Sequence, residues 1–69
     1  MPVLNHEMNP GIRVYVEGFD GEGKYIEGKA EIVEKPLSTT QNWIKIRLIA
    51  DGSIHRIDND NVFWRSQGN

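Results

Sequence analysis

The stretch that decides the fold is Trp43–Ile57, which reads WIKIRLIADGSIHRI. Apolar and polar residues alternate on both sides of an Asp51-Gly52 pair, and such alternation is typical of β-strands with one buried face. An Asp-Gly pair between two alternating runs is a strong hairpin signal, because glycine readily adopts the positive φ of a tight turn. The stretch therefore predicts an antiparallel hairpin with strands at 43–50 and 53–57.

A two-residue turn would set the register of this hairpin by pairing Ala50 with Ser53. A bulged turn would slip the second strand by one residue and place Arg56 inside. We favour the two-residue turn, because an inward histidine costs less than an inward arginine. Side chains alternate between the two faces. The inward side chains are then Ile44, Ile46, Leu48, His55 and Ile57. The outward side chains are Trp43, Lys45, Arg47, Ile49, Ile54 and Arg56.

This register gives the outward face two unusual pairs. Arg47 lies opposite Arg56, and like charges directly opposite each other destabilise a sheet. Ile49 lies opposite Ile54 on a surface that water should cover. The pairs predict that something neutralises the arginines and something covers the isoleucines.

Three interpretations of the outward face remain open. Acidic residues of a neighbouring strand, Glu27 and Glu31, would neutralise Lys45 and Arg47 in a solvated ladder of ion pairs. A recognition face with an aromatic and several basic residues would meet an anionic partner, since such residues are enriched at protein hot spots and at single-stranded nucleic acid. Self-association through the isoleucines would give a homo-oligomer that shares its core.

The rest of the chain predicts three more strands. Alternation at 12–17 and at 24–35 indicates two strands before the hairpin, separated by a glycine-rich loop at 18–23. The Asx-rich segment 58–61 predicts a tight turn of 3₁₀ type, and 62–65 a short last strand. The sequence thus predicts an all-β fold, a small five-stranded antiparallel, partly open barrel with a 3₁₀ turn before the last strand.

The predicted domain organisation is simple. Residues 1–10 contain two prolines and no periodicity, and they are expected to form a flexible N-terminal arm. The small β-barrel domain is expected at 11–65, with a polar connector at 37–42 and a tail at 66–69. A chain of 69 residues has room for one domain only.

Short motifs indicate a resemblance to a known class of folds. Gly11–Val14 opens the first predicted strand, Gly28–Ala30 lies within the second, and Asp51-Gly52 is followed by Ile57 and Val62. In this order the chain resembles the Src-homology-3-like small barrels of the Tudor and KOW type, over about residues 11 to 65. The resemblance implies an interaction module, and in Tudor domains an aromatic cage that holds a methylated ammonium. The residues that would form such a cage are Phe19, Tyr25 and Trp43.

Composition limits the function further. The chain has no cysteine, which excludes disulfides and thiolate metal sites. The net charge of the chain is −2, whereas a dedicated duplex-DNA binder carries an excess of basic residues. Residues 1–34 carry seven acids and three bases, whereas 35–69 carry three acids and five bases, and this asymmetry can steer a partner. The N-terminus lacks a secretion signal and no segment is long and apolar enough for a membrane span, so we expect a cytoplasmic protein with no membrane partner.

No residues form a catalytic or metal-binding signature, and we expect no cofactor. His6 and His55 have no nearby second ligand or nucleophile in the sequence. Residues 52–57 occupy the place of the pore-lining strand in the plasmid-borne type of dihydrofolate reductase, a similarly short barrel that forms tetramers. Where that family has a Val-Gln-Ile-Tyr run, this chain reads Ile-His-Arg-Ile at Ile54–Ile57. The reductase activity is therefore not implied for this chain.

The predicted function is therefore a non-catalytic interaction module or accessory protein. It binds a protein partner through the outer face of the 43–57 hairpin. The first alternative is a small barrel that binds RNA or DNA through the same basic and aromatic face, and the second is a small oligomeric enzyme.

Overall fold

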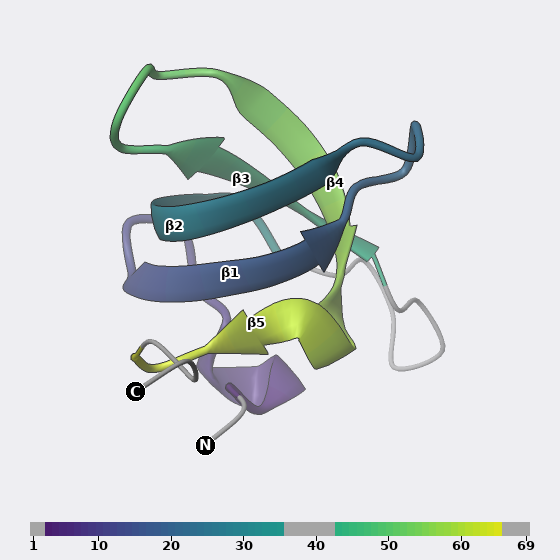
Figure 1. The fold of residues 1–69 in the computed structure, drawn as a ribbon. Coiled ribbons are helices and arrows are strands. Elements are labelled where there is room, and N and C mark those ends of the chain that lie inside the picture. The colour runs from purple at the N-terminus through teal and green to yellow at the C-terminus, as the bar shows by residue number, and fades with distance from the viewer. Residues whose placement is uncertain (1–2, 36–42, 66–69) are drawn as a thin grey trace.

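A computed structural model describes residues 3–35 and 43–65. The predicted connector at 37–42 and the predicted tail at 66–69 lie outside these residues. The described chain forms five β-strands and two single-turn 3₁₀ helices (Figure 1). In chain order the elements are η1 (Asn5–Glu7), β1 (Arg13–Phe19), β2 (Tyr25–Glu34), β3 (Trp43–Leu48), β4 (Ile54–Asp58), η2 (Asn59–Asn61) and β5 (Val62–Phe63).

The five strands form one antiparallel sheet in the order β4-β3-β2-β1-β5. The sheet curls so that β1 and β2 lie in front of β3 and β4 in Figure 1. It is not closed into a barrel, but the edge strand β4 returns to the end of β1. There Asp20 forms an isolated bridge with Ile57, and the Gly21 N–H donates to the Arg56 carbonyl at 2.8 Å. The predicted class, all-β with five antiparallel strands in a partly open arrangement, is confirmed.

The predicted 3₁₀ turn before the last strand is present as η2. Asp58 caps it, because its carboxylate accepts a hydrogen bond from the backbone N–H of Asp60 at 2.8 Å. Asx side chains favour such turns because they can replace a backbone acceptor. The last strand is shorter than predicted, and ends at Phe63.

The core lies on the concave side of the curled sheet. Alternation places one face of each strand inward, so the buried side chains come from all five strands and from the segment that precedes them. They are Val3, Met8, Val14, Val16, Ile26, Ala30, Ile32, Ile44, Ile46, Ile57 and Val62.

The segment before β1 is part of the fold, where the sequence predicted a flexible arm. Val3 and Met8 are buried in the core, and η1 lies between them. The Val3 N–H donates to the Val62 carbonyl at 3.0 Å, so the segment covers the outer edge of β5. A covered edge cannot template pairing with another chain, and the edge of β4 is itself partly paired with Asp20 and Gly21.

The hairpin register differs from the predicted one by two residues. Arg47 lies opposite Ile54, and Leu48 donates to the Ser53 carbonyl at 2.9 Å, so the connection is a four-residue loop at 49–52. Two contacts hold this longer loop: the Gly52 N–H donates to the Leu48 carbonyl at 2.8 Å, and the Ile49 N–H donates to the Lys29 carbonyl of β2 at 2.9 Å. The prediction of a two-residue turn was wrong. A shift of two residues nevertheless leaves the side chains of β3 and β4 on their predicted faces, and of the side chains assigned to a face only Ile49 moves into the loop.

Candidate functional site

Five of the six predicted binding residues lie on the outer face of the hairpin, and the sixth lies in its loop. Trp43, Lys45 and Arg47 point outward from β3, while Ile54 and Arg56 point outward from β4. Ile49 lies in the 49–52 loop, and its exposed side chain is no longer opposite Ile54. The predicted apolar pair of isoleucines is therefore absent, and Ile54 remains the exposed apolar residue of β4, with half of its surface accessible.

The predicted pairing of Arg47 with Arg56 is also absent. Arg47 lies between Ile54 on β4 and Glu31 on β2, and its guanidinium forms an ion pair with the Glu31 carboxylate. The hydrogen bond from Arg47 holds the pKa of Glu31 below its ordinary value. The predicted ion pair between the second strand and the hairpin is thus present at this position. It leaves Arg47 less available to an external partner than the sequence suggested.

A different like-charge pair occupies the outer face. Lys45 and Arg56 lie directly opposite each other on β3 and β4. On its other side Lys45 lies opposite Glu34, past a bulge in β2, while the exposed Arg56 guanidinium forms no ion pair within residues 3–35 and 43–65. Arg56 is therefore the outward arginine with its charge still open to a partner.

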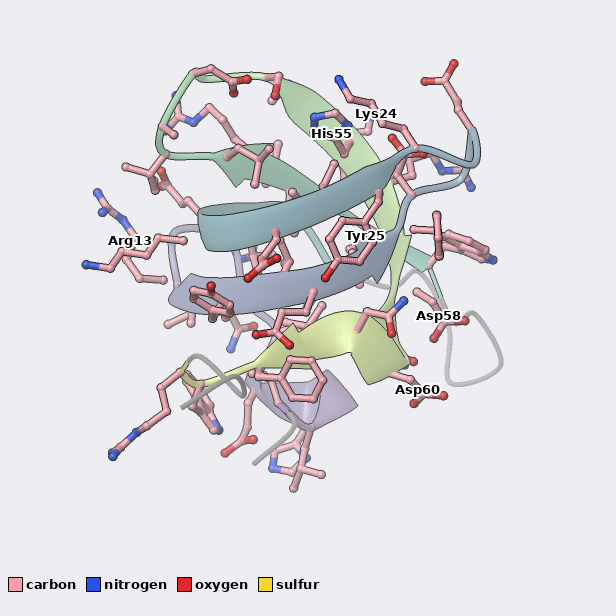
Figure 2. All side chains as sticks on the ribbon, viewed as in Figure 1. Arg13, Lys24, Tyr25, His55, Asp58 and Asp60 are labelled. Atoms are coloured by element: carbon pink, nitrogen blue, oxygen red, sulfur yellow. The ribbon has the colours of Figure 1, made fainter. Side chains whose placement is uncertain are left out.

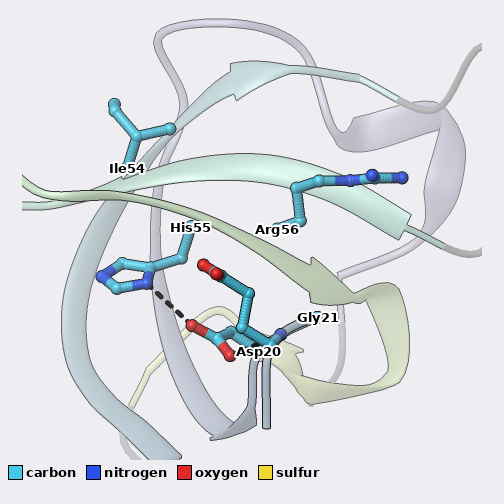
Figure 3. A pocket seen from close by; sticks show the side chains of 6 residues that line it. Asp20, Gly21, Ile54, His55 and Arg56 are labelled. Atoms are coloured by element: carbon cyan, nitrogen blue, oxygen red, sulfur yellow. Dashed lines mark hydrogen bonds and ion pairs between the residues drawn. The ribbon is translucent and has the colours of Figure 1, made fainter. Parts of the chain in front are cut away.

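A shallow pocket of about 320 Å³ lies beside Ile54 and Arg56, between β4 and the loop that joins β1 to β2 (Figure 3). Ile54 forms the apolar wall of the pocket, and polar and charged residues form most of the remaining lining. The lining residues are Asp20, Gly21, Glu22, Ile54, His55 and Arg56.

The rigid part of this pocket is a hydrogen bond between His55 and Asp20. His55 Nδ1 lies 3.0 Å from Asp20 Oδ2, and both side chains are nearly buried (Figure 3). The other carboxylate oxygen of Asp20 accepts the backbone N–H groups of Glu22 and Lys24, each at 2.9 Å. The N–H of Lys24 is the main cause that lowers the pKa of Asp20 below 3.8; burial opposes it, and the hydrogen bond with His55 adds to it. One aspartate thus ties β4 to the loop and fixes the loop's backbone.

The hydrogen-bond chain continues past the imidazole. His55 Nε2 lies 2.8 Å from the Ser53 hydroxyl, which in turn donates to Asp51 Oδ1 at 2.7 Å. The sequence shows no second ligand or nucleophile near His55, but the fold brings Asp20 to it from a loop 35 residues away in the sequence. Asp20, His55 and Ser53 have the connectivity of an acid–base–hydroxyl triad.

The surroundings of Ser53 favour a structural role for this chain of groups. Its hydroxyl proton goes to Asp51, so it is not directed at the imidazole. The nearest backbone donors are also occupied: the Ser53 N–H donates to Asp51 Oδ1 and the Gly52 N–H to the Leu48 carbonyl. A hydroxyl nucleophile needs both a free base and donors for the developing oxyanion. With the aspartates Asp51 and Asp20 at its two ends, the chain of hydrogen bonds joins the 49–52 loop to the loop after β1.

We predict that this cluster makes the fold sensitive to acid. The folded-state pKa values of Asp20 and Asp51 are both lowered, Asp51 chiefly by the Ser53 hydroxyl. Their contribution to stability is therefore present above pH 3.8 and is lost as the pH falls through the folded-state pKa values. Asp20→Asn should lower stability near neutral pH and reduce its decline in acid.

Urea denaturation at a series of pH values checks this prediction. Asp60→Asn is the matched control, because the Asp60 side chain is exposed. Wild type and the control should lose stability together in acid, whereas Asp20→Asn should change less. Three parallel acid profiles would contradict the prediction.

Two of the three predicted cage aromatics lie together. Phe19 and Tyr25 face each other across β1 and β2, with ring centroids 5.4 Å apart and an interplanar angle of 73°. They are 62% and 51% exposed. Trp43 is positioned from β3 against the loop, where a Cβ atom added to Gly21 would lie 3.8 Å from its ring.

Comparisons with protein-family models, with curated proteins and with solved structures find no match. Within the described residues, no helix is long and apolar enough to cross a membrane. Residues 3–35 and 43–65 also contain no group of three or more His, Cys, Asp or Glu side chains placed to hold a metal ion. The chain is thus a small all-β protein whose candidate site is the outer face of β3 and β4 with the adjoining pocket.

Proposed function

We propose that the chain is a non-catalytic interaction module that binds a protein partner through the outer face of the 43–57 hairpin. The observation that carries the proposal is the half-exposed Ile54 beside the Arg56 side chain at the rim of a preformed pocket. An apolar anchor next to an arginine is a composition typical of binding hot spots. The partner segment should offer an apolar side chain to Ile54 and a carboxylate to Arg56.

The rigidity of the pocket supports the same proposal. The hydrogen bond of His55 with Asp20 holds one wall against the other, so little conformational freedom is lost when a partner binds. Arg47 contributes less, since Glu31 already neutralises it. Among the described residues of this face, Arg56 is the arginine that forms no ion pair, and the chain's net charge is −2, so a protein surface fits the face better than a phosphate backbone does. Membership of the Src-homology-3-like barrels stays a prediction.

Site-specific crosslinking tests the proposal. A photo-reactive amino acid at position 54, introduced in cells of the native host, should capture a defined protein. The same group at Leu4 should not capture it. Leu4 is 54% exposed, and it follows Val3, which binds β5, the edge strand at the other end of the order from β4.

The purified partner then allows affinities to be compared. Ile54→Asp and Arg56→Glu should each weaken binding about tenfold or more, whereas Leu4→Asp should leave the affinity unchanged. Equal capture from both positions would contradict the proposal. Capture of nucleic acid from position 54, with affinity that falls steeply as salt rises, would support the RNA- or DNA-binding alternative instead.

A further inference from the structure

A second pocket, of about 420 Å³, lies where β5 ends beside the start of β1. β5 pairs with β1 through Tyr15 and Val16, so Trp64 and Arg65 follow the strand without belonging to it. Pockets that hold small ligands usually measure about 300–1,000 Å³, so the volume is sufficient for one. The lining residues are Arg13, Val14, Tyr15, Lys29, Trp64 and Arg65.

The lining of the second pocket combines aromatic rings with basic groups. Three side chains are basic, two are aromatic, and none of the described lining residues is acidic. Trp64 is 41% exposed, whereas the aliphatic side chain of Val14 is buried. The pocket beside the hairpin differs, because Ile54 forms its apolar wall and two carboxylates belong to its lining. The second pocket therefore offers flat rings and positive charge, with little aliphatic surface.

Arg13 keeps its positive charge although an acid lies beside it. Arg13 is opposite Glu31 on β2, but the Glu31 carboxylate already forms an ion pair with Arg47. The hydrogen bond from Arg47 is the main cause that lowers the pKa of Glu31; burial opposes it, and the charges of Arg47 and Arg13 add to it. Within residues 3–35 and 43–65 the Arg13 guanidinium forms no ion pair of its own. One carboxylate thus faces two arginines, and positive charge remains at the start of β1.

Charge changes sign along the outer face of β1 and β2. Glu17 and Glu27 lie opposite each other toward the loop that joins the two strands, whereas Arg13 lies at the beginning of β1, where Figure 2 labels it. Lys29 lies between these ends, and the two glutamates beside it offset part of its charge. The second pocket is therefore at the positive end of this face, and Arg13 is its main anion-binding group.

The second pocket and the outer face of the hairpin lie on different sides of the molecule. In Figure 2, β1 and β2 lie in front of β3 and β4, and core side chains from both strand pairs fill the space between them. A ligand in the second pocket therefore leaves Ile54 and Arg56 accessible to a partner.

We propose that the second pocket binds single-stranded nucleic acid. A base stacks on Trp64 with the ring of Tyr15 nearby, and phosphates of the strand meet Arg13 and Lys29. Exposed rings within a positive groove bind single strands in this way, because every base has a flat face and every nucleotide a negative charge. In a duplex the bases are paired and stacked on one another, so the rings have no base to receive. This activity goes beyond the proposed function, since it uses a different surface.

Fluorescence polarisation with a labelled oligouridylate tests the proposal. A length of about ten nucleotides lies within the usual site size of such proteins, about 4–16 nucleotides. The full chain should bind it in buffer of about 20 mM salt. If two phosphates are neutralised, the slope of log affinity against log salt is about −1.4, so a tenfold rise in salt should lower the affinity about 25-fold. A duplex of the same length should bind more weakly than the single strand.

Variants of the two faces locate the binding site. Arg13→Glu and Trp64→Ala should each weaken binding of the oligouridylate about tenfold or more. Trp64→Phe keeps a ring for stacking and should retain most of the affinity. Arg56→Glu makes the same charge change on the hairpin, and Trp43→Ala removes the other tryptophan of the chain, so both should bind within about twofold of the wild type. Circular dichroism establishes that each variant is folded.

Free uridine monophosphate distinguishes a single strand from a separate nucleotide as the ligand. It offers one base and no neighbouring phosphates, so it should compete with the labelled strand only at a concentration at least about tenfold higher. Competition at equal concentration would overturn the proposal, because the pocket would then be a site for free nucleotides.

Three further results would overturn the inference. The first is a folded wild type that binds no oligouridylate in low salt. The second is a Trp64→Ala variant that binds like the wild type. The third is an equal loss of affinity from Arg56→Glu and Arg13→Glu, which would mean that the second pocket is not the site. A wild type that binds no nucleic acid, but whose position 54 captures a protein, would reject this inference and leave the proposed function standing.

Discussion

Ile46→Ala is expected to remove about 2–5 kcal/mol from the free energy of unfolding. Ile46 is completely buried in β3, opposite Ile32 on β2, and truncation to alanine leaves a cavity that the surrounding strands fill incompletely. A chain of 69 residues has a total stability of only about 3–10 kcal/mol. Most of that stability should therefore be lost, and urea denaturation followed by circular dichroism measures the loss.

Ile54→Ala is the matched control for this variant. Ile54 belongs to the same hairpin but points to the opposite face, and half of its surface is exposed. Its truncation should change stability by no more than about 0.5 kcal/mol. If the two variants lost equal amounts of stability, the assignment of Ile46 to the buried face and of Ile54 to the exposed face would be contradicted.

Met8→Ala should destabilise the fold by a similar amount, about 2–5 kcal/mol. Met8 precedes every strand of the sheet, yet it is completely buried. If residues 3–10 were a flexible arm, the substitution would have almost no effect. Thermal or urea unfolding distinguishes the two outcomes.

Leu4→Ala is the control in the same segment. Leu4 is 54% exposed, so its truncation should cost no more than about 0.5 kcal/mol. A Met8→Ala variant as stable as Leu4→Ala would contradict the assignment of this segment to the core.

The strands were predictable because one face of each is buried. Alternation in Trp43–Ile57 correctly separated inward from outward residues, since burial acts on every second side chain. The register was not predictable in this way. A two-residue turn and a four-residue loop differ by an even number of residues and place the same side chains inside. Which of the two loops forms depends on individual hydrogen bonds, such as that from the Ile49 N–H to the Lys29 carbonyl. The alternation of apolar and polar residues gives no information on such bonds.

The burial of residues before β1 was not predicted, for a related reason. Val3 and Met8 belong to a segment without extended strand structure, so no repeating pattern marks them. Gly18 was predicted to lie in a loop, but β1 continues through it, because a residue without a side chain leaves room for Asn61 of η2. In both cases the deciding contact joins residues far apart in the sequence.

The candidate site was predictable only in part. The ion pair between Glu31 and Arg47 follows from neighbouring strands with opposite charges, and it belongs to one of the three interpretations that the sequence left open. The hydrogen bond of Asp20 with His55 depends on how far the sheet curls, which brings a loop after β1 to the edge of β4. Alternation along single strands carries no information on that curvature.

The hydrogen bond between Val3 and Val62 limits when this protein can fold during synthesis. A nascent chain is made from its N-terminus, and Val3 has no partner at the edge of β5 until residue 62 has left the ribosome. Until then β1 also lacks one of its neighbours in the sheet, and buried Met8 lacks part of its surroundings. Contacts of such sequence separation slow folding. The core should therefore assemble in a single late step, after translation of the whole domain.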